Sequence, residues 1–365
     1  MNLTNNLTAH DLDPGQLVSS LNGTVKSFAG DRGVIAWEYL TSLVCAVGAL
    51  TNITILLIIL RYPLLRKGAG LFIAHLLVCH LAICAVCLPL AILRIAKVTT
   101  PSIGLQDPLV CRHQHVFHAT FNTLVNWSEG LLAVNRLVAI FLPLKFPLFN
   151  RRPVQCACLC VCWAVTLAYS LPPLYEDLAV YKLSSIGTCA FVAKSAFSTA
   201  LLSFNAYCPL FLMAMAGVAI VYRANLPRRR FQTTEESNRV SSITPRQAKD
   251  NLVQLNSNAK RQKRTTRMLM TSFALSLFCQ VPQYISLLAG YSAAHPEIVL
   301  CFWFMQLIQF TSTPVIFLKM NKDYQHKAAV FYSCIFRPTQ VRPRVNLSLV
   351  LRAGRSVKDA RENTD

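Results

Sequence analysis

Residues 37–60 read WEYLTSLVCAVGALTNITILLIIL, an apolar run in which Glu38 is the only charged residue. An apolar run of about 18 residues or more is typical of a helix that crosses a lipid bilayer, because about 20 residues at 1.5 Å each span a hydrocarbon core of about 30 Å. Six further runs can be drawn. The third span is the least apolar, since it holds polar residues and Glu129, and it is counted because the strongly apolar run Gly130–Leu142 is too short to span alone. We therefore predict an all-α membrane protein, a bundle of seven transmembrane helices at residues 37–60, 69–93, 110–137, 154–173, 198–223, 264–290 and 298–318.

The composition excludes several other classes of protein. Of 365 residues, 53% are hydrophobic and only 14% are charged, against about 25% charged residues in a soluble domain. An ordinary soluble enzyme, a small disulfide-stapled secreted domain and a disordered chain are all excluded. The net charge of +20 first suggests nucleic-acid binding, but the position of the charges decides otherwise.

Lys and Arg residues lie mostly on one side of the predicted bundle. With the amino terminus outside, seven of the 36 fall on the outer side and 29 on the inner side. Cytoplasmic loops carry the excess of Lys and Arg in membrane proteins, so the amino terminus is predicted outside and the carboxyl terminus in the cytoplasm. The basic charge is then a cytoplasmic face beside anionic lipid, and no nucleic-acid partner is expected.

The predicted spans divide the chain into four regions. Residues 1–36 form an extracellular tail with glycosylation acceptor patterns at Asn2, Asn6 and Asn22. Residues 37–318 form the bundle, in which the third inner loop, about 224–262, is predicted to be disordered with helices extending into it from both ends. Residues 319–336 form a short amphipathic eighth helix, in which Cys334 is a candidate for palmitoylation. Residues 337–365 form a basic cytoplasmic tail.

The cysteines suggest one disulfide and no metal site. Cys156, Cys158, Cys160 and Cys162 alternate along one predicted helix, where each residue turns about 100°, so the four thiols cannot converge on one zinc ion. Cys111 begins the third span at its outer end and Cys189 lies in the second outer loop. Both face the oxidising side of the membrane, which favours a disulfide between them.

Several short motifs stand in a fixed order on the predicted spans. Span one carries Gly48 and Asn52, Arg136 follows Cys111 by twenty-five residues, and Trp163 stands in the middle of span four. Proline interrupts spans five, six and seven, and the last two motifs read Cys279-Gln280-Val281-Pro282 and Thr313-Pro314-Val315-Ile316-Phe317, followed by Tyr324. Over residues 37–336 this order resembles the rhodopsin-like (class A) G-protein-coupled receptors.

The resemblance implies a receptor that transmits the binding of an extracellular ligand to heterotrimeric G proteins, with arrestin and a receptor kinase as further partners and no cofactor. A buried helix proline removes one backbone hydrogen bond and allows a bend, so helices five, six and seven are expected to rearrange. The residues that correspond to the family's coupling and switch positions are Asn135, Arg136, Gln280, Pro282, Thr313, Pro314 and Phe317.

The departures from the family pattern concern the groups around Arg136. Asn135 replaces the neighbouring aspartate, and Gln262 takes the position of the acidic partner on helix six. Arg136 then has no obvious carboxylate to hold it inactive, and we expect raised basal signalling. A charge near the membrane's inner edge is costly unless it faces protein or water, and the other interpretation of Arg136 is that it extends to the lipid headgroups.

Two ionisable residues lie within the predicted membrane core. His80 replaces the sodium-site aspartate of the family, and Glu129 is the only acid near the middle of a span. Glu129 precedes Arg136 by about two helical turns and therefore shares its face. One hypothesis pairs His80 with Glu129, which would let the pair titrate near physiological pH. The alternative is a protonated Glu129 that is hydrogen-bonded to a neighbouring helix.

The family's ligand site lies between the outer halves of helices three, five, six and seven. His118 corresponds to the aspartate that binds biogenic amines, and span seven has no lysine for retinal, so neither ligand is expected. The site is predicted to be aromatic and neutral-polar, which suits a lipid, a small neutral molecule or a peptide end. Its predicted residues are His118, Asn122, Tyr207, Gln283, Tyr284, Trp303 and Gln306.

Within the class, Asn135-Arg136-Leu137, Leu171-Pro172-Pro173, Arg267-Met268-Leu269 and His295-Pro296 are similar to the invertebrate trapped-in-endoderm and moody receptors. That resemblance implies an orphan receptor used in cell migration or barrier formation. Two rival functions stay open: a seven-helix decoy or scaffold without G-protein signalling, and a transporter, which usually has paired charges or a repeat. The sequence holds no nucleophile–base set or phosphate loop, and we do not predict an enzyme.

Overall fold

The computed structural model describes residues 32–66, 68–98, 108–171, 179–183, 189–225, 245–288 and 296–336. Seven helices in these ranges are long and apolar enough to cross a membrane, which confirms the predicted bundle. The predicted glycosylation sites Asn2, Asn6 and Asn22, the prolines at 172 and 173, and the tail after residue 336 lie outside the described residues. The side chains of Gln262 and Cys334 lie outside them as well.

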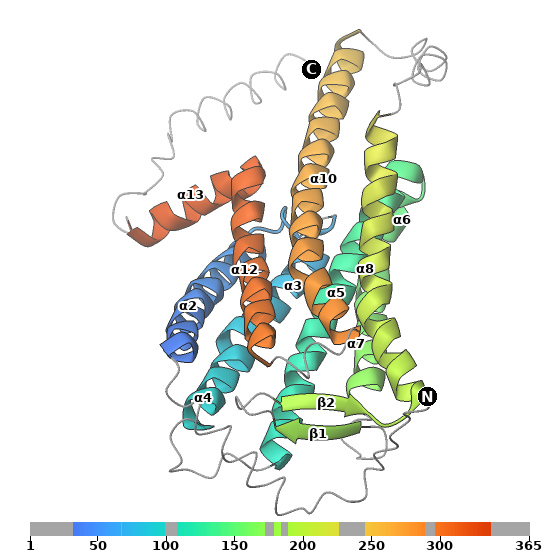
Figure 1. Ribbon diagram of the computed structural model, residues 1–365. Coiled ribbons are helices and arrows are strands. Elements are labelled where there is room, and N and C mark those ends of the chain that lie inside the picture. The colour runs from blue at the N-terminus through green and yellow to red at the C-terminus, as the bar shows by residue number, and fades with distance from the viewer. Residues whose placement is uncertain are drawn as a thin grey trace, which may run out of the picture. The chain divides into compact units, whose positions relative to one another are not determined.

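Seven long helical segments and several short elements follow one another along the chain (Figure 1). The first is α2, which begins before the predicted span, and α10 reaches far into the predicted third inner loop. The bounds are α2 Arg32–Arg61, α3 Gly70–Ala82, the π-helix Ile83–Cys87, α4 Leu88–Val98, α5 Pro108–Phe141, α6 Phe146–Phe149, α7 Arg152–Ser170, α8 Ala196–Asn225, α10 Pro245–Leu288, α12 Pro296–Met320 and α13 Lys322–Phe336.

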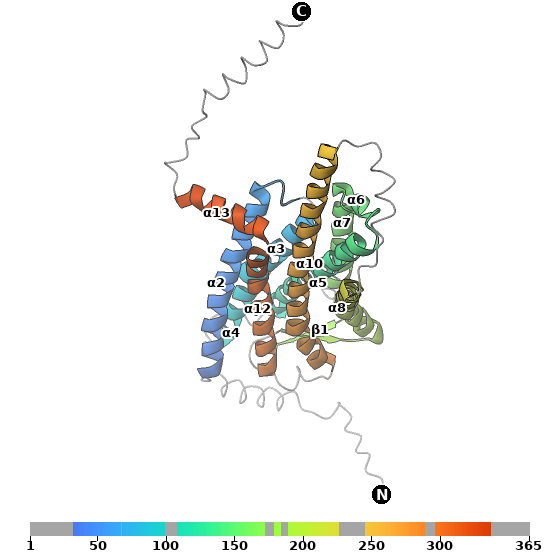
Figure 2. The same ribbon diagram turned by 90° about the horizontal axis from the view of Figure 1, so that it is seen from above.

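Helix α5 is the central element of the bundle. It packs against α3, α7 and α8 and also contacts α10, while α12 packs between α2 and α10 (Figures 1 and 2). This position explains why the span with the most polar side chains is still a membrane helix: Asn126, Ser128 and Glu129 are buried against protein and not exposed to lipid. A polar residue in a membrane helix ordinarily faces the bundle interior.

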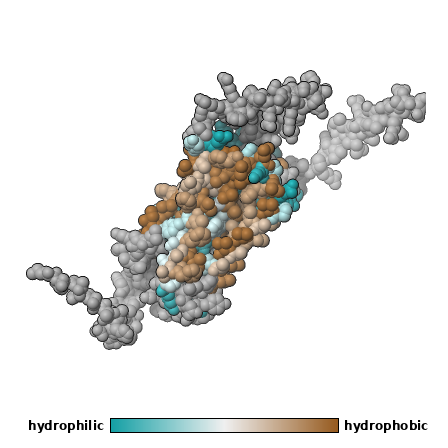
Figure 3. Space-filling model, turned by 90° about the vertical axis from the view of Figure 1, so that its right-hand side faces the viewer, coloured by the Kyte–Doolittle hydropathy of each residue, from teal (hydrophilic) through white to brown (hydrophobic). Residues whose placement is uncertain are grey.

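The outer surface of the bundle is apolar. Large side chains that a soluble protein would bury are more than half exposed, including Leu43, Phe211, Val218 and Phe278. Figure 3 shows this hydrophobic surface over the middle of the described part of the molecule. An exposed apolar belt of this size is expected for a protein whose solvent is the bilayer. The chain is therefore a multi-pass membrane protein.

A short antiparallel hairpin lies between two helices of the predicted all-α bundle. Strand β1 (Ala179–Leu183) pairs with β2 (Cys189–Ala193), with Ala179 opposite Ala193 and Leu183 opposite Cys189. Both strands contact α5. Figure 1 shows the hairpin at the end of the bundle opposite α6, and we call these the hairpin end and the α6 end. Five-residue strands between membrane helices carry too little alternation to be recognised in a sequence.

The second membrane span contains a π-helical turn. Residues Ile83–Cys87 form it between α3 and α4, and the amide of Leu88 bonds to the carbonyl of Ile83. A π-turn adds one residue to the helix and turns everything beyond it relative to a regular α-helix. Pro89 lies just after this turn. The turn therefore sets which side chains of α4 point into the bundle.

Most of α13, from His326 to Phe336, belongs to a separate unit of the chain. Within it the rings of Phe331 and Tyr332 contact each other edge to face, with centroids 6.0 Å apart. The predicted amphipathic helix at 319–336 is thus present as α13, starting at Lys322.

A hydrogen-bonded chain joins α7, α3 and α5 inside the bundle. Trp163 Nε1 donates to His75 Nε2 at 3.0 Å, and His75 Nδ1 lies 2.8 Å from Ser128 Oγ. An indole N–H can only donate, so His75 Nε2 is the acceptor and Nδ1 carries the proton that Ser128 accepts. Ser128 Oγ then donates to the carbonyl of Leu124. Every bond in this chain has one possible direction, which fixes the tautomer of His75.

We expect His75→Leu to destabilise the bundle, because it leaves the indole N–H of the half-buried Trp163 without its acceptor. A fully buried donor without a partner costs about 1–3 kcal/mol, so partial burial places the expected cost at about 1 kcal/mol. The measurement is thermal unfolding of the purified protein, with Trp163→Phe and the double variant completing a cycle. If the two single effects simply add in the double variant, the proposed coupling between the residues is absent.

Candidate functional site

Arg136 lies in α5 near the α6 end and is 5% exposed. Its neighbour is the phenol of Tyr324, with which it interacts electrostatically, and its Nε has no hydrogen-bond partner. Among the described residues no carboxylate bonds Arg136. The side chain therefore faces protein, which disfavours extension to lipid headgroups.

Asn135, next to Arg136, connects α5 to the turn before α7. Its Nδ2 donates to Asn150 Oδ1 at 3.5 Å. Gln155 Nε2 donates to the same oxygen at 3.2 Å and to the carbonyl of Gly68. The residue that replaces the family's aspartate thus bonds a neutral amide and does not neutralise Arg136.

A buried polar network joins α5, α10 and α12 in the middle of the bundle. Ser276 Oγ donates to Glu129 Oε1 at 2.6 Å, and Gln309 Nε2 donates to the same oxygen at 3.2 Å. Gln309 Nε2 also lies 2.9 Å from Ser276 Oγ, and Gln280 Nε2 donates to Gln309 Oε1 at 3.1 Å. All four residues are buried. One carboxyl oxygen therefore holds three helices together. We call Glu129, Ser276, Gln280 and Gln309 the core network.

The predicted pair of His80 and Glu129 is not formed. Both ring nitrogens of His80 are buried without a hydrogen-bond partner, and its ring lies against Phe310 with centroids 5.0 Å apart. Phe310 occupies the space beside His80, and Gln309, the preceding residue, reaches Glu129 in its place. Glu129 is instead bonded to α10 and α12, while its Oε2 has no partner.

Gln280, one of the predicted switch residues, belongs to the core network. Other predicted switch residues follow the network residues along α10 and α12. Pro209, Pro282 and Pro314 stand inside α8, α10 and α12. Thr313 Oγ1 donates to the carbonyl of Gln309 at 2.8 Å, and Phe317 is fully buried one turn further on. The structure thus places the proline-containing helices next to the polar groups whose rearrangement would change their packing.

Some of the predicted ligand residues come together between α5, α8 and α10. Tyr207 donates its hydroxyl to the carbonyl of Tyr284 at 2.9 Å, and their ring centroids are 5.7 Å apart. Asn126 Nδ2 donates to the hydroxyl of Tyr284 at 2.8 Å, and Asn122 lies one turn away on the same face of α5. Asn126 was not among the predicted residues, although it follows Asn122 by one helical turn and could have been found by that spacing.

Other predicted ligand residues lie nearer the hairpin end, between α5 and α12. The rings of His118 and Trp303 have centroids 5.7 Å apart. Gln306 is buried one turn along α12, and its Nε2 has no partner; Gln283 on α10 likewise has a buried Oε1 without a partner. The predicted residues therefore form two groups, and the structure describes no direct contact that joins them.

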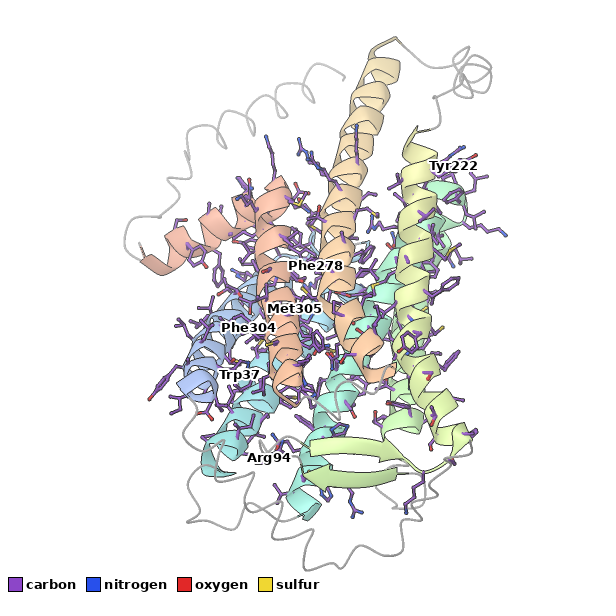
Figure 4. The ribbon with its side chains drawn as sticks, in the orientation of Figure 1. Trp37, Arg94, Tyr222, Phe278, Phe304 and Met305 are labelled. Carbon is purple, nitrogen blue, oxygen red and sulfur yellow. The ribbon has the colours of Figure 1, made fainter. Side chains whose placement is uncertain are left out.

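The sequence interpretation missed Arg94 and Gln114 at the hairpin end. Arg94 is 3% exposed, and its Nη1 donates to Gln114 Oε1 at 2.5 Å. Figure 4 shows Arg94 on α4 at the hairpin end of the bundle. In the sequence, Arg94 is one of the cations on the predicted outer side of the membrane. It lies where the chain changes from apolar to polar residues, and this position does not indicate whether its side chain is buried.

The cysteines fall into the two groups that the sequence suggested. Cys111 is disulfide-bonded, and β2, which begins at Cys189, contacts α5; the pairing of Cys111 with Cys189 stays a prediction. Cys156 and Cys160 are exposed whereas Cys162 is buried. The four alternate thiols of α7 thus lie on different faces of the helix.

Seven apolar helices, internal prolines in α8, α10 and α12 and a buried arginine at the α6 end are the features of a seven-span receptor bundle in a membrane. The family model "7 transmembrane receptor (rhodopsin family)" matches residues 51–313. The chain belongs to this family, the rhodopsin-like G-protein-coupled receptors. A comparison with curated protein sequences finds no match. The family is one of signalling receptors, which bind extracellular ligands and G proteins, and not generally one of enzymes.

Proposed function

We propose that this receptor carries the binding of an extracellular ligand at the hairpin end to a heterotrimeric G protein at the α6 end. The core network supports this proposal most directly, because it lies between the two ends and joins α5 to both α10 and α12. Those two helices and α8 contain the internal prolines. A change in the packing of one of these helices is therefore expected to change the packing of the others.

The proposed topology has the amino terminus outside the plasma membrane and the carboxyl terminus in the cytoplasm. The distribution of Lys and Arg supports it, and so does the disulfide at Cys111, which lies near the hairpin end. Glycans on Asn2, Asn6 and Asn22, a Cys111–Cys189 disulfide and palmitate on Cys334 complete this proposal. Arrestin and a receptor kinase are the further cytoplasmic partners.

Within the family we propose a relationship to the trapped-in-endoderm and moody receptors. It rests on Asn135-Arg136-Leu137, Leu171-Pro172-Pro173, Arg267-Met268-Leu269 and His295-Pro296. The ligand is proposed not to be a biogenic amine, because His118 stands where a counter-ion for an ammonium group is needed. Retinal is likewise not proposed, because span seven offers no lysine for a Schiff base.

The test is ligand-free activation of a panel of G-protein α subunits in cells. We expect the native chain to signal above mock-transfected cells, since no described carboxylate restrains Arg136. Arg136→Ala should return the signal to the mock level, whereas Arg61→Ala, which removes an exposed cation at the end of α2, should leave it unchanged. Surface expression is matched for all three.

Two results would argue against this proposal. A signal that survives Arg136→Ala would mean that coupling does not pass through this side chain. Silence of the native chain with every α subunit would contradict raised basal signalling and favour the alternative of a decoy or scaffold, which Asn135 in place of the family's aspartate also suits.

A further inference from the structure

Four amide oxygens are buried without a hydrogen-bond partner on the facing sides of α5 and α10. They are Oδ1 of Asn122 and Asn126 on α5 and Oε1 of Gln280 and Gln283 on α10. Residues three or four apart share one face of a helix, so each pair points the same way. The bond from Asn126 Nδ2 to the hydroxyl of Tyr284 at 2.8 Å joins the two faces. We call Asn122, Asn126, Gln280 and Gln283 the acceptor cluster.

The bonds that the cluster already makes determine which amide atoms stay free. Glu129 Oε1 accepts from Gln309 Nε2, so Gln309 presents its Oε1 to Gln280. Only the Nε2 of Gln280 can donate to that oxygen, and the Oε1 of Gln280 is left as an acceptor. Asn126 likewise uses its Nδ2 for Tyr284 and is left with Oδ1. The free atoms are therefore acceptors.

The acceptor cluster extends from half-buried to fully buried side chains. Asn122 and Gln283 are half-buried, whereas Asn126 and Gln280 are at most 1% exposed. Helix α5 runs away from the hairpin end and α10 runs toward it (Figure 1), which places the two half-buried residues nearer that end. A group that enters the bundle from the hairpin end would therefore meet acceptors from the partly exposed part down to the core network.

Buried polar groups in proteins ordinarily have hydrogen-bond partners, and four acceptors without one require a group that donates. A charged donor costs more to bury than a neutral one. The rings of Tyr207 and Tyr284, with centroids 5.7 Å apart, give the site an aromatic side next to Asn126. We propose that the acceptor cluster binds the N–H or O–H donors of a neutral head group, a carboxamide or a hydroxyl, on an aromatic or apolar ligand. This inference rests on the proposed ligand-binding function and narrows its ligand class.

Binding is measured by thermal stabilisation of the full chain in nanodiscs of zwitterionic lipid, which needs no G protein. The probes are phenylacetamide and its N-methyl and N,N-dimethyl forms, which lose their N–H groups one at a time on the same skeleton. A second pair is 2-phenylethanol and its methyl ether. We expect affinity to fall about tenfold with each N–H or O–H removed, because a buried acceptor then loses its donor.

Gln283→Met removes one acceptor and keeps the length of the side chain. Because Gln283 Oε1 has no partner to lose, the ligand-free variant should melt at the native temperature or above it, while phenylacetamide should bind about tenfold more weakly. A glutamine with only a structural role would give the opposite result, a lower melting temperature with the N–H preference unchanged. If this variant does not fold, Asn122→Leu removes the acceptor on α5 and should weaken binding equally.

Gln325→Met is the matched control, because it makes the same exchange at an exposed side chain of α13 and should keep the full shift. The inference is wrong if no neutral probe stabilises the native chain, or if the N,N-dimethyl form stabilises it as well as phenylacetamide does. It is also wrong if Gln283→Met and Asn122→Leu both keep the native preference for N–H groups.

An ammonium head group is the nearest rival, because Glu129 follows Asn126 by one turn and its Oε2 has no partner. 2-Phenylethylamine is therefore tested beside the neutral probes. Stronger stabilisation by this amine than by phenylacetamide, lost in Glu129→Gln, would assign the site to a cation and overturn the neutral head group.

The assay separates this inference from the proposed function. Amide binding together with silent G-protein assays would retain the acceptor cluster and remove the proposed signalling. Ligand-free signalling without any preference for N–H or O–H groups would remove the acceptor cluster alone. The two failures are therefore distinguishable.

Discussion

Gly70→Ala is expected to abolish the folded receptor almost completely. A Cβ atom on Gly70 would lie 1.9 Å from the carbonyl oxygen of Leu65 and 2.8 Å from its carbonyl carbon. Both are backbone atoms, so no side chain can move aside, and the turn between α2 and α3 must open. Forcing atoms into a packed site costs on the order of 3 kcal/mol. The measurement is surface expression together with thermal unfolding of any purified protein.

Gly130→Ala is the matched control for this prediction. Gly130 is also a buried helical glycine, but its added Cβ would meet Pro209 at 3.9 Å, an ordinary van der Waals distance. We expect near-native expression from Gly130→Ala, since alanine also favours helix by up to about 1 kcal/mol over glycine. Equal expression of the two variants would show that the turn before α3 does not have the described geometry.

Glu129→Leu is expected to lower stability and to raise ligand-free signalling together. The carboxyl oxygen of Glu129 is the acceptor that α10 and α12 share, through Ser276 and Gln309. Without it, α10 loses the bond that Ser276 makes to α5, while the bond from Asn126 to Tyr284 remains. The loss of hydrogen bonds from a buried network costs about 1–3 kcal/mol, which corresponds to a fall in melting temperature on the order of 5 °C. Both thermal unfolding and the G-protein assay are measured.

Glu129→Gln separates the hydrogen bonds from the charge. Its amide oxygen can still accept from Ser276 and Gln309 in the place of Oε1, so we expect a smaller change in both measurements than with Glu129→Leu. If leucine raises stability and leaves signalling at the native level, the core network does not restrain α10. If glutamine behaves like leucine, the charge and not the shared acceptor is what matters.

Much of the fold could be predicted because membrane helices are marked by composition. The first two spans are the most apolar, and α5 was recognisable through its apolar end despite Asn126 and Glu129. Helix ends were harder: α2 starts at Arg32 and α10 at Pro245, since helices continue beyond the bilayer where hydropathy no longer marks them. The hairpin and the π-turn leave no comparable trace in the sequence.

The sequence predicted several residues of the site but not the side chains to which they are hydrogen-bonded. Burial of Glu129 and Arg136 on one side of α5 followed from their spacing, and both are buried. The hydrogen-bond partner of Glu129 depends on which neighbouring helix reaches it. The spacing of residues along α5 shows which face they share, but not which residue of another helix lies opposite. His80 was therefore paired wrongly, and Arg94 was missed because charge alone does not tell whether a side chain at a helix end points inward.

The π-turn at Ile83–Cys87 has a consequence for the evolution of this receptor. It holds one more residue than an α-helical turn would, so one residue can be removed there and the turn can become regular while α4 keeps its orientation. Arg94 would still reach Gln114. Elsewhere in this span a deletion would rotate Arg94 toward the bilayer by about 100°. This turn is thus a place where the span can lose one residue while the side chains of α4 keep their direction relative to the bundle.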